Sequence, residues 1–161
     1  MINDEFSYEK TSETAKDPVY STTESACFDI FADFGNFASD RTLSPGETAI
    51  IPTGLIFHIP HGLKVSLYPR SGLSLKGVRL ANSVGQIDSD YHKPVGAIVH
   101  NSSDEAIRFQ TGDPICQGAL EPVIWASAIR IKNMERRGGF GSTGGNPDWN
   151  NALAQASGLG V

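Results

Sequence analysis

The sequence is poor in cysteine and has no long hydrophobic run, and both features narrow the possible classes of protein. Only two cysteines, Cys27 and Cys116, occur among the 161 residues. Each is flanked by residues typical of strands, so we expect buried, reduced thiols rather than a disulfide framework. No apolar run approaches the roughly 20 residues that a membrane helix requires, so we expect no membrane partner.

The sequence also lacks the usual patterns of a zinc site and of a nucleic-acid-binding protein. Its four histidines show no metal-ligand spacing with the cysteines, so any metal would be held by oxygen ligands. The formal net charge is −5 at pH 7, whereas polymeric nucleic acid is bound mainly by clustered Lys and Arg. A small polyphosphate remains possible, because it needs only a local cluster of positive charge.

The N-terminal segment Met1–Lys16 is polar and acidic, without the basic start and apolar core of a secretory signal. We therefore predict a cytoplasmic protein, or one of the host-cell cytoplasm if the source is viral. A length of 161 residues is typical of one domain. We predict a loose arm over residues 1–20, with a short strand near Pro18–Tyr20, a β domain over residues 21–132, and a flexible C-terminal arm over residues 133–161.

Short apolar runs separated by Gly, Pro and Asn predict an all-β protein of jelly-roll type, either a sandwich or a barrel. In Leu63–Pro69, for example, apolar and polar residues alternate with the period of a half-buried strand. Pairs such as Pro45-Gly46 and His61-Gly62 supply turns. Only Ser71–Lys76 could form a short helix. The predicted strands are Cys27–Phe34, Glu47–Ile51, Leu55–Ile59, Leu63–Pro69, Val95–Asn101, Ala106–Gln110, Pro114–Glu121 and Val123–Ile131.

The stretch from Asn82 to Tyr91 combines turn formers, two carboxylates and an aromatic residue between apolar runs. Gly85 tolerates a positive φ, and Asp88 and Asp90 can bond their own backbone, so the chain could reverse here in a hairpin that presents polar groups to a ligand. An Asx-type surface turn without function is the alternative interpretation, and it is the more frequent one for such a run taken alone.

Two further stretches favour a phosphate ligand. Pro69–Leu73 follows a predicted strand and opens the short helix, which brings backbone N–H groups, a hydroxyl and a guanidinium together. Gly138–Gly144 follows Arg136-Arg137 and could cradle phosphates. The alternative for the first stretch is a helix cap with a solvated arginine. The alternative for the second stretch is a flexible linker.

Taken together and in order, five short motifs resemble those of the trimeric deoxyuridine triphosphatases, the dUTPase family. Any one of these motifs alone would be weak, but five in order are specific. The resemblance spans about Ser25 to Gly144. The motifs are Ser25–Ile30, Pro69–Leu73, Gly85–Tyr91, Gly112–Gln117 and Gly138–Gly144.

The resemblance implies roles for residues of the third motif and the stretch before it. Asp88 matches the carboxylate that orients and deprotonates the attacking water. Asn82 matches the hairpin that reads uracil, to which Gly85 and Ile87 contribute backbone groups. Tyr91 matches the aromatic residue that lies under deoxyribose and leaves no space for a 2′-hydroxyl.

The other motifs are implied to bind the triphosphate, its metal and the base. In the second motif, Arg70, Ser71 and Gly72 match a phosphate-binding turn. Asp29 matches an acid that reaches magnesium (Mg2+) through water, and Gln117 matches a phosphate-side amide. The fifth motif adds a ring that closes over the base and groups that bind phosphate, namely Phe140, Gly141, Ser142, Thr143 and Arg136.

Two departures from the family pattern are visible. Lys93-Pro94 stands where the family often has Gly two residues after the tyrosine, so the chain could leave the hairpin differently. Glu135 occupies the usual arginine position five residues before the phenylalanine. Either Arg136 or Arg137 could replace that arginine.

The activity implied by the resemblance is hydrolysis of dUTP to dUMP and pyrophosphate by a magnesium-dependent homotrimer. Water would attack the α-phosphate in line with the leaving pyrophosphate. A dCTP deaminase-like enzyme of the same fold is one alternative, although it needs a catalytic glutamate where the third motif has aspartates. A non-catalytic nucleotide-sensing or protein-binding relative is another, although Asp88 would be expected to be absent from it.

Overall fold

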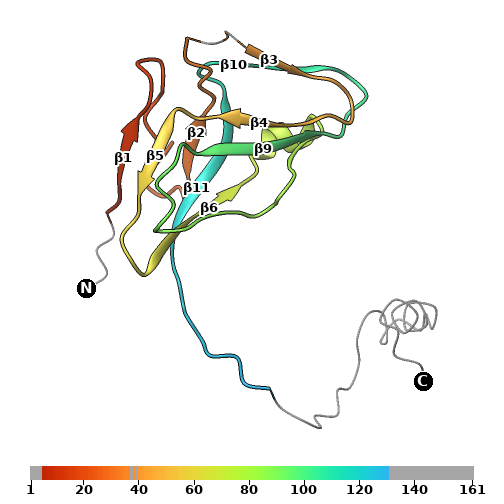
Figure 1. Ribbon diagram of the computed structural model, residues 1–161. Helices are drawn as coiled ribbons and strands as arrows, with labels where there is room; N and C mark the ends of the chain where they lie inside the picture. Colours follow the sequence, from red (N-terminus) through yellow and green to blue (C-terminus); the bar gives the residue numbers. More distant parts are fainter. Residues whose placement is uncertain (1–4, 37, 39, 131–161) are drawn as a thin grey trace, which may run out of the picture. The chain divides into compact units, whose positions relative to one another are not determined.

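The computed structural model describes residues 5–36, 38 and 40–130, and the chain divides into two compact units, Met1–Trp125 and Ala126–Val161. Of the second unit only residues 126–130 are described, and they form no helix or strand. Figure 1 shows the elements of the first unit. They are β1 (Ser7–Lys10), β2 (Phe28–Phe31), β3 (Asp40–Leu43), β4 (Thr48–Pro52), β5 (Leu55–His58), β6 (Leu63–Tyr68), α1 (Ser71–Leu75), β7 (Val78–Leu80), β8 (Gly85–Ile87), β9 (Gly96–Asn101), β10 (Ile107–Gln110) and β11 (Pro114–Pro122).

The strands form an all-β fold of jelly-roll type, as predicted. One sheet has the order β2-β11-β6-β8, a second has the order β4-β9-β7, and two further pairs are β1-β5 and β10-β3. All of these pairings are antiparallel. Because strands that are distant in sequence lie side by side, residues from several motifs can meet at one end of a sheet.

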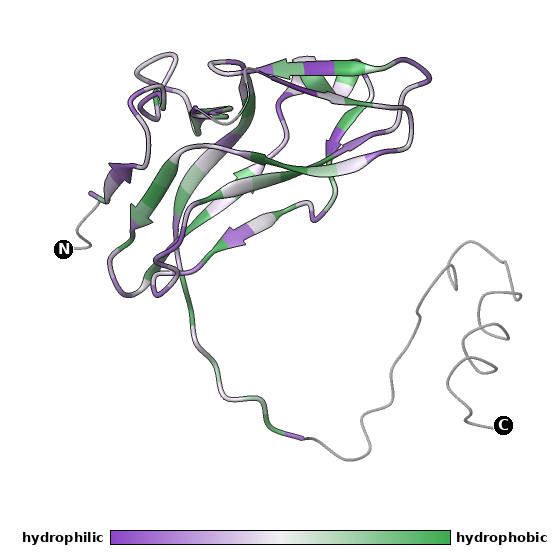
Figure 2. Ribbon diagram, turned by 45° about the horizontal axis from the view of Figure 1, so that its top comes forward, coloured by the Kyte–Doolittle hydropathy of each residue, from purple (hydrophilic) through white to green (hydrophobic). Residues whose placement is uncertain are grey.

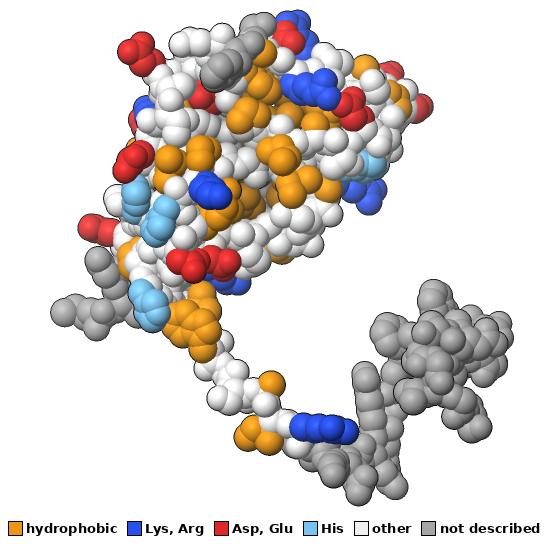
Figure 3. Space-filling view, viewed as in Figure 1, with side chains coloured by type: hydrophobic (Ala, Val, Ile, Leu, Met, Phe, Trp, Pro, Cys, Tyr) orange, Lys and Arg blue, Asp and Glu red, His pale blue; other side chains and the backbone are white. Residues whose placement is uncertain are grey.

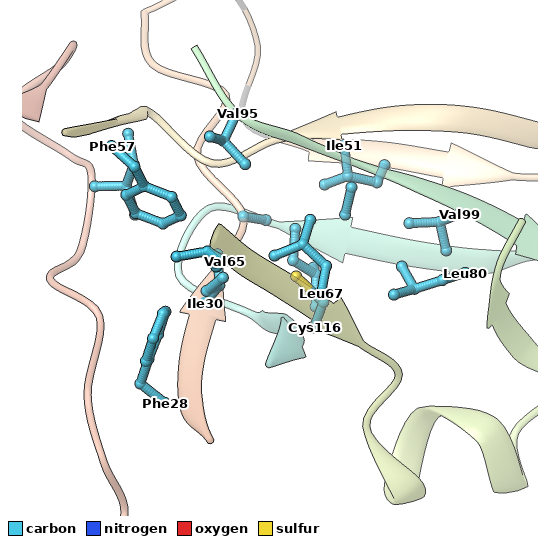
Figure 4. Packing of buried hydrophobic residues seen from close by; sticks show 14 of the residues in the cluster. Phe28, Ile30, Ile51, Phe57, Val65, Leu67, Leu80, Val95, Val99 and Cys116 are labelled. Carbon is cyan, nitrogen blue, oxygen red and sulfur yellow. The ribbon is translucent and has the colours of Figure 1, made fainter. Parts of the chain in front are cut away.

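The core lies between the four-stranded and the three-stranded sheets (Figure 4). Ile30 and Leu67 of the first sheet pack toward Ile51 and Val99 of the second, and all four are almost fully buried. Several strands carry alternating hydrophobic and hydrophilic bands (Figure 2), as expected for half-buried strands. Ser66 is an exception, since it is fully buried on the polar side of β6 and its hydroxyl donates to Glu121 Oε2 at 2.8 Å.

The short helix and the two predicted turns are present, but other local predictions differ from the structure. Ser7–Lys10, in the segment predicted to be a loose arm, form β1, which pairs with β5. Near Pro18–Tyr20 the structure has an isolated bridge between Val19 and Asp29 rather than a strand. The prediction of a strand over Val123–Ile131 is wrong for its described part, residues 123–130. Strands β3, β7 and β8 were not predicted.

A buried carboxylate attaches the N-terminal segment to the domain. Asp33 is 4% exposed and accepts hydrogen bonds from Ser12 Oγ and Thr14 Oγ1, each at 2.5 Å. Gly54 approaches this carboxylate so closely that a Cβ there would lie 2.2 Å from Asp33 Oδ2, and its φ of +67° also favours glycine. The segment that follows β1 is therefore held by specific polar contacts.

Candidate active site

A pocket of about 470 Å³ lies where β6 ends and α1 begins. The register explains why distant residues meet there, because Gln117 of β11 lies opposite Asp29 of β2 on one side and Tyr68 of β6 on the other. Five of the predicted phosphate and metal residues line this pocket. They are Asp29, Arg70, Ser71, Gly72 and Gln117.

Arg70 is fixed in the pocket by an ion pair with Asp29. Arg70 Nε donates to Asp29 Oδ1 at 3.0 Å, and Nη2 donates to Oδ2 at 3.4 Å. Ser21 Oγ donates to the same Oδ2 at 3.0 Å. Two bonds between planar groups orient a guanidinium more narrowly than one bond could, so the positive charge of Arg70 is presented in a defined direction.

The first turn of α1 offers exposed polar groups beside Arg70. Ser71 and Gly72 are exposed, and Arg70, the N-cap residue, makes no side-chain capping bond. A Cβ at Gly72 would meet no atom within 4 Å, so packing in the described chain does not require glycine there. The open backbone at this position instead leaves space for a ligand to approach.

Gln117 supports the turn that carries these groups. Its Nε2 donates to Pro69 O at 2.9 Å. The amide therefore holds the backbone just before Arg70, a contribution to the pocket that the sequence did not indicate.

Asn82, Gly85, Ile87, Asp88 and Tyr91 form a second group that does not line this pocket. The prediction of a simple hairpin here is wrong, because β8 pairs with β6 and not with the neighbouring strands β7 and β9. Gly85 also does not have the expected positive φ. Instead it lies in β8, where a Cβ would come within 3.1 Å of Leu67 Cβ, so close packing of β8 on β6 explains the glycine.

Asp88 and Tyr91 form a turn beyond β8. Tyr91 N donates to Asp88 O at 3.1 Å, and Tyr91 OH donates to Pro94 O at 3.2 Å. Both residues are exposed, and within the described chain no hydrogen bond engages the Asp88 carboxylate. Its oxygens are therefore available to a ligand or to water.

Asp88 and Arg70 lie toward opposite ends of β6, whereas Gly85 is opposite Leu67 and lies nearer the pocket. Ile87, just before Asp88, is opposite Val65, whereas Arg70 follows the C-terminal end of β6. Val65 and Arg70 are five residues apart, which corresponds to roughly 17 Å of extended strand. One chain therefore presents the predicted catalytic carboxylate and the predicted phosphate pocket far from each other.

The pocket also contains residues to which the motifs assigned no individual role. Ser25 and Cys27 of the first motif line it together with Ser21, which precedes that motif, and the polar run that begins at Ser21 was the available signal for Ser21. Burial raises the pKa of the Cys27 thiol, with smaller contributions from Glu121 and Asp29, so Cys27 remains a neutral thiol. Cys116 is a free, buried thiol as predicted, and burial raises its pKa to about 12. Cys27 is also free but is only half-buried, because it lines the pocket.

The pocket offers few direct ligands for magnesium. Asp29 is the one carboxylate among the described residues that line the pocket, and no cluster of three or more His, Cys, Asp or Glu side chains suited to a metal occurs in residues 5–36, 38 and 40–130. Mg2+ prefers oxygen ligands and keeps several waters. A single carboxylate therefore fits an ion held chiefly by a bound polyphosphate.

The predicted residues of the fifth motif lie outside the described residues. They are Arg136, Phe140, Gly141, Ser142 and Thr143.

Comparison with known proteins identifies the class to which this fold and pocket belong. A family model described as dUTPase matches residues 13–144. The chain therefore belongs to the dUTPase family, as the five motifs predicted.

Relatives named deoxyuridine 5'-triphosphate nucleotidohydrolase are similar over most of their length. The protein from Roseobacter denitrificans is 44% identical over 133 residues, covering 80% of this chain and 86% of that protein. The protein from Nautilia profundicola is 39% identical over 140 residues, covering 84% and 95% of the two chains.

Solved structures of phage dUTPases share the fold. A mutant of the phage 80α dUTPase has a TM-score of 0.74 at 25% identity, covering 88% of this chain and 99% of that chain. An aspartate-to-asparagine mutant of the dUTPase of the Staphylococcus aureus phage φ11, whose structure reveals the coordination of a structural Mg(II) ion, has a TM-score of 0.71 at 23% identity, covering 82% of this chain and 99% of that chain. The second likeness concerns the fold alone.

Among residues 5–36, 38 and 40–130, no helix is both long and apolar enough to cross a membrane.

Proposed function

We propose that this protein is a magnesium-dependent, homotrimeric dUTP diphosphatase that converts dUTP to dUMP and pyrophosphate. Family membership and relatives named deoxyuridine 5'-triphosphate nucleotidohydrolase support the reaction. One observation supports the assignment of roles to particular residues. A single pocket brings together Asp29, Arg70 and Gln117 from three strands or their ends.

Asp88 is the proposed general base. It accepts a proton from water while the water oxygen attacks the α-phosphorus, and the bond from that phosphorus to the bridging oxygen of the leaving pyrophosphate breaks. The exposed carboxylate, which no described donor engages, suits this role because its oxygens can hold the water. Such a base typically contributes about 10²–10⁴-fold to the rate.

Arg70, Ser71, Gly72 and Gln117 are proposed to bind the triphosphate. The guanidinium supplies charge, while the hydroxyl and backbone N–H groups of the first turn of α1 supply donors. Gln117 keeps Pro69 in place, so its replacement would also displace Arg70.

Asp29 is the residue that would reach Mg2+ through water. When bound to the triphosphate, magnesium neutralises negative charge on the phosphates and on the leaving pyrophosphate. Asp29 also orients Arg70, so the carboxylate has a structural contact whether or not metal is present.

The segment from Asn82 to Tyr91, which includes β8, is proposed to bind the nucleoside. Asn82 and the backbone at Gly85 and Ile87 read the uracil edge, where an exocyclic amine would present a donor in place of the O4 acceptor. Tyr91 lies under the sugar and excludes a 2′-hydroxyl by steric clash.

A trimer is proposed because one chain separates the two halves of the site. The register places the Asp88 loop and the Arg70 pocket toward opposite ends of β6. An oligomer can bring the loop of one protomer to the pocket of another.

The C-terminal arm, residues 133–161, is proposed to complete the site. Phe140 would cover uracil, while Gly141, Ser142, Thr143 and Arg136 or Arg137 would contact the phosphates. Excluding water would strengthen these charge interactions. Because Glu135 stands at the family's arginine position, we expect Arg136→Ala to lower kcat/KM more than Glu135→Ala does.

The test is pyrophosphate release from each of dUTP, UTP, dCTP and dTTP with magnesium, in the wild type and in Asp88→Asn. We expect release from dUTP alone to be fast, and we expect the variant to fold and bind dUTP but to lose turnover. Near-normal kcat in Asp88→Asn would exclude Asp88 as the base. Deamination of dCTP without pyrophosphate release would instead support the deaminase-like alternative.

A further inference from the structure

A series of side-chain contacts links the N-terminal strand β1 to the loop that carries Tyr91. Glu9 of β1 lies 2.8 Å from His58 of β5, measured between Oε1 and Nε2. The ring of His58 stacks on that of His92, with centroids 6.1 Å apart and planes inclined by 27°. His92 directly follows Tyr91, so the series ends beside the proposed sugar-binding residue.

Hydrogen bonds also hold the chain on both sides of Tyr91. The Tyr91 hydroxyl donates to Pro94 O at 3.2 Å. One residue further on, Thr53 Oγ1 donates to Val95 O at 2.7 Å, and Thr53 is buried. Between these bonds and the turn at Asp88, the ring of His92 stacks on that of His58 in β5. The stack on His58 therefore fixes the middle of the loop, where Tyr91 lies.

We propose that His92, stacked on His58 and supported by Glu9, is a positioning residue that orients Tyr91 and thereby sets selectivity for deoxyribose over ribose. The inference rests on the proposed role of Tyr91. A steric filter depends on the exact place of the ring, and a misplacement of about 1 Å can change a rate by roughly 10²-fold. This would give β1 a part in specificity although it contributes no residue to the site.

The expected effect is moderate because the contacts are exposed to solvent. The side chains of His58 and Glu9 are 40% and 65% exposed, and exposed pairs of this kind contribute little each. Figure 3 shows histidine side chains, in pale blue, gathered on the surface of this region. We expect a loss of selectivity of about two- to fivefold, which corresponds to the upper range for exposed pairs.

The experiment compares kcat/KM for dUTP with that for UTP in wild type, His92→Ala, His92→Phe and Glu9→Ala. We expect His92→Ala to narrow the ratio, mainly by raising kcat/KM for UTP, with Tm and kcat for dUTP unchanged. His92→Phe should restore selectivity, because a ring that can stack on His58 is restored. His100→Ala is the matched control, since His100 hydrogen-bonds Thr48 on another sheet.

A double variant tests whether the contacts act as one series. Glu9→Ala should narrow the ratio in the wild type but add nothing in the His92→Ala background. Full additivity, or an unchanged ratio in His92→Ala, would overturn the inference.

Tyr91→Ala separates this inference from the function on which it rests. If Tyr91→Ala narrows the ratio and His92→Ala does not, the positioning role is wrong while the role of Tyr91 stands. If Tyr91→Ala leaves the ratio unchanged, both roles are wrong.

Discussion

Mixed trimers of two inactive variants should recover activity, because the loop and the pocket lie toward opposite ends of β6. The first variant, Asp88→Asn, has an inactive loop and an intact pocket. The second, Arg70→Gln, has a weakened pocket and an intact loop, and its amide can still donate to Asp29, so the partly buried carboxylate keeps a partner. Each variant alone should be nearly inactive with dUTP.

The size of the recovery follows from how each site is assembled. Suppose that a site combines the pocket of one protomer with the loop of another. When equal amounts of the two variants mix at random, the pocket of a given site is intact with a probability of one half, and so is its loop. About one quarter of the sites in the whole mixture then hold both intact components, and this fraction is about one third in the purified trimers that contain both variants. If one protomer supplied both components, every site would contain a defect and no activity would return.

The assay uses the two variants with different affinity tags, unfolded together, refolded and purified through both tags in sequence. The initial rate of pyrophosphate release is compared with that of wild type treated in the same way. Trimers of each variant mixed without unfolding provide the control for residual activity. If doubly tagged trimers are no more active than the parents, the shared site is refuted.

Three further outcomes are expected. Truncation after Lys132 should leave Tm nearly unchanged but lower kcat/KM for dUTP severely, and Phe140→Ala should reproduce part of that loss; unchanged activity would mean that the arm is only a linker. Asp33→Ala should lower the free energy of unfolding in urea by about 1–3 kcal/mol, because the N-terminal hydroxyls lose a buried acceptor. Glu121→Gln should lower Tm at pH 7 but less in acid. Hydrogen bonds, chiefly from Tyr68, lower the pKa of Glu121 from its ordinary 4.5. The stabilisation by the Glu121 carboxylate is therefore complete above that value and disappears as the pH falls through the lowered pKa. An equal Tm difference at pH 7 and pH 3 would contradict that linkage.

Strands with a strong alternating pattern could be predicted from the sequence, whereas short or polar strands could not. The alternation in β6 is visible because its apolar side faces the core. β1 is exposed at all four residues, and β7 and β8 have three residues each. Such strands depend on a neighbouring strand rather than on their own pattern. The apolar residues from Val123 onward led to a wrong prediction of a strand, because apolar character alone does not supply a partner strand.

The site residues could be selected by motif, but their arrangement could not be predicted. The order of the motifs pointed to Asp29, Arg70 and Gln117, which the fold does bring together. Nothing in the sequence indicated that Gln117 would hold Pro69, or that close packing on Leu67 rather than a positive φ would explain Gly85. These are contacts between residues that are distant in sequence.

Hydrolysis of dUTP in water enriched in oxygen-18 tests the central claim most directly. If water attacks the α-phosphorus, the heavy oxygen will appear in dUMP, and mass spectrometry will find unlabelled pyrophosphate. Heavy oxygen in the pyrophosphate, or in inorganic phosphate released with dUDP, would place the attack on the β- or γ-phosphorus and contradict the account.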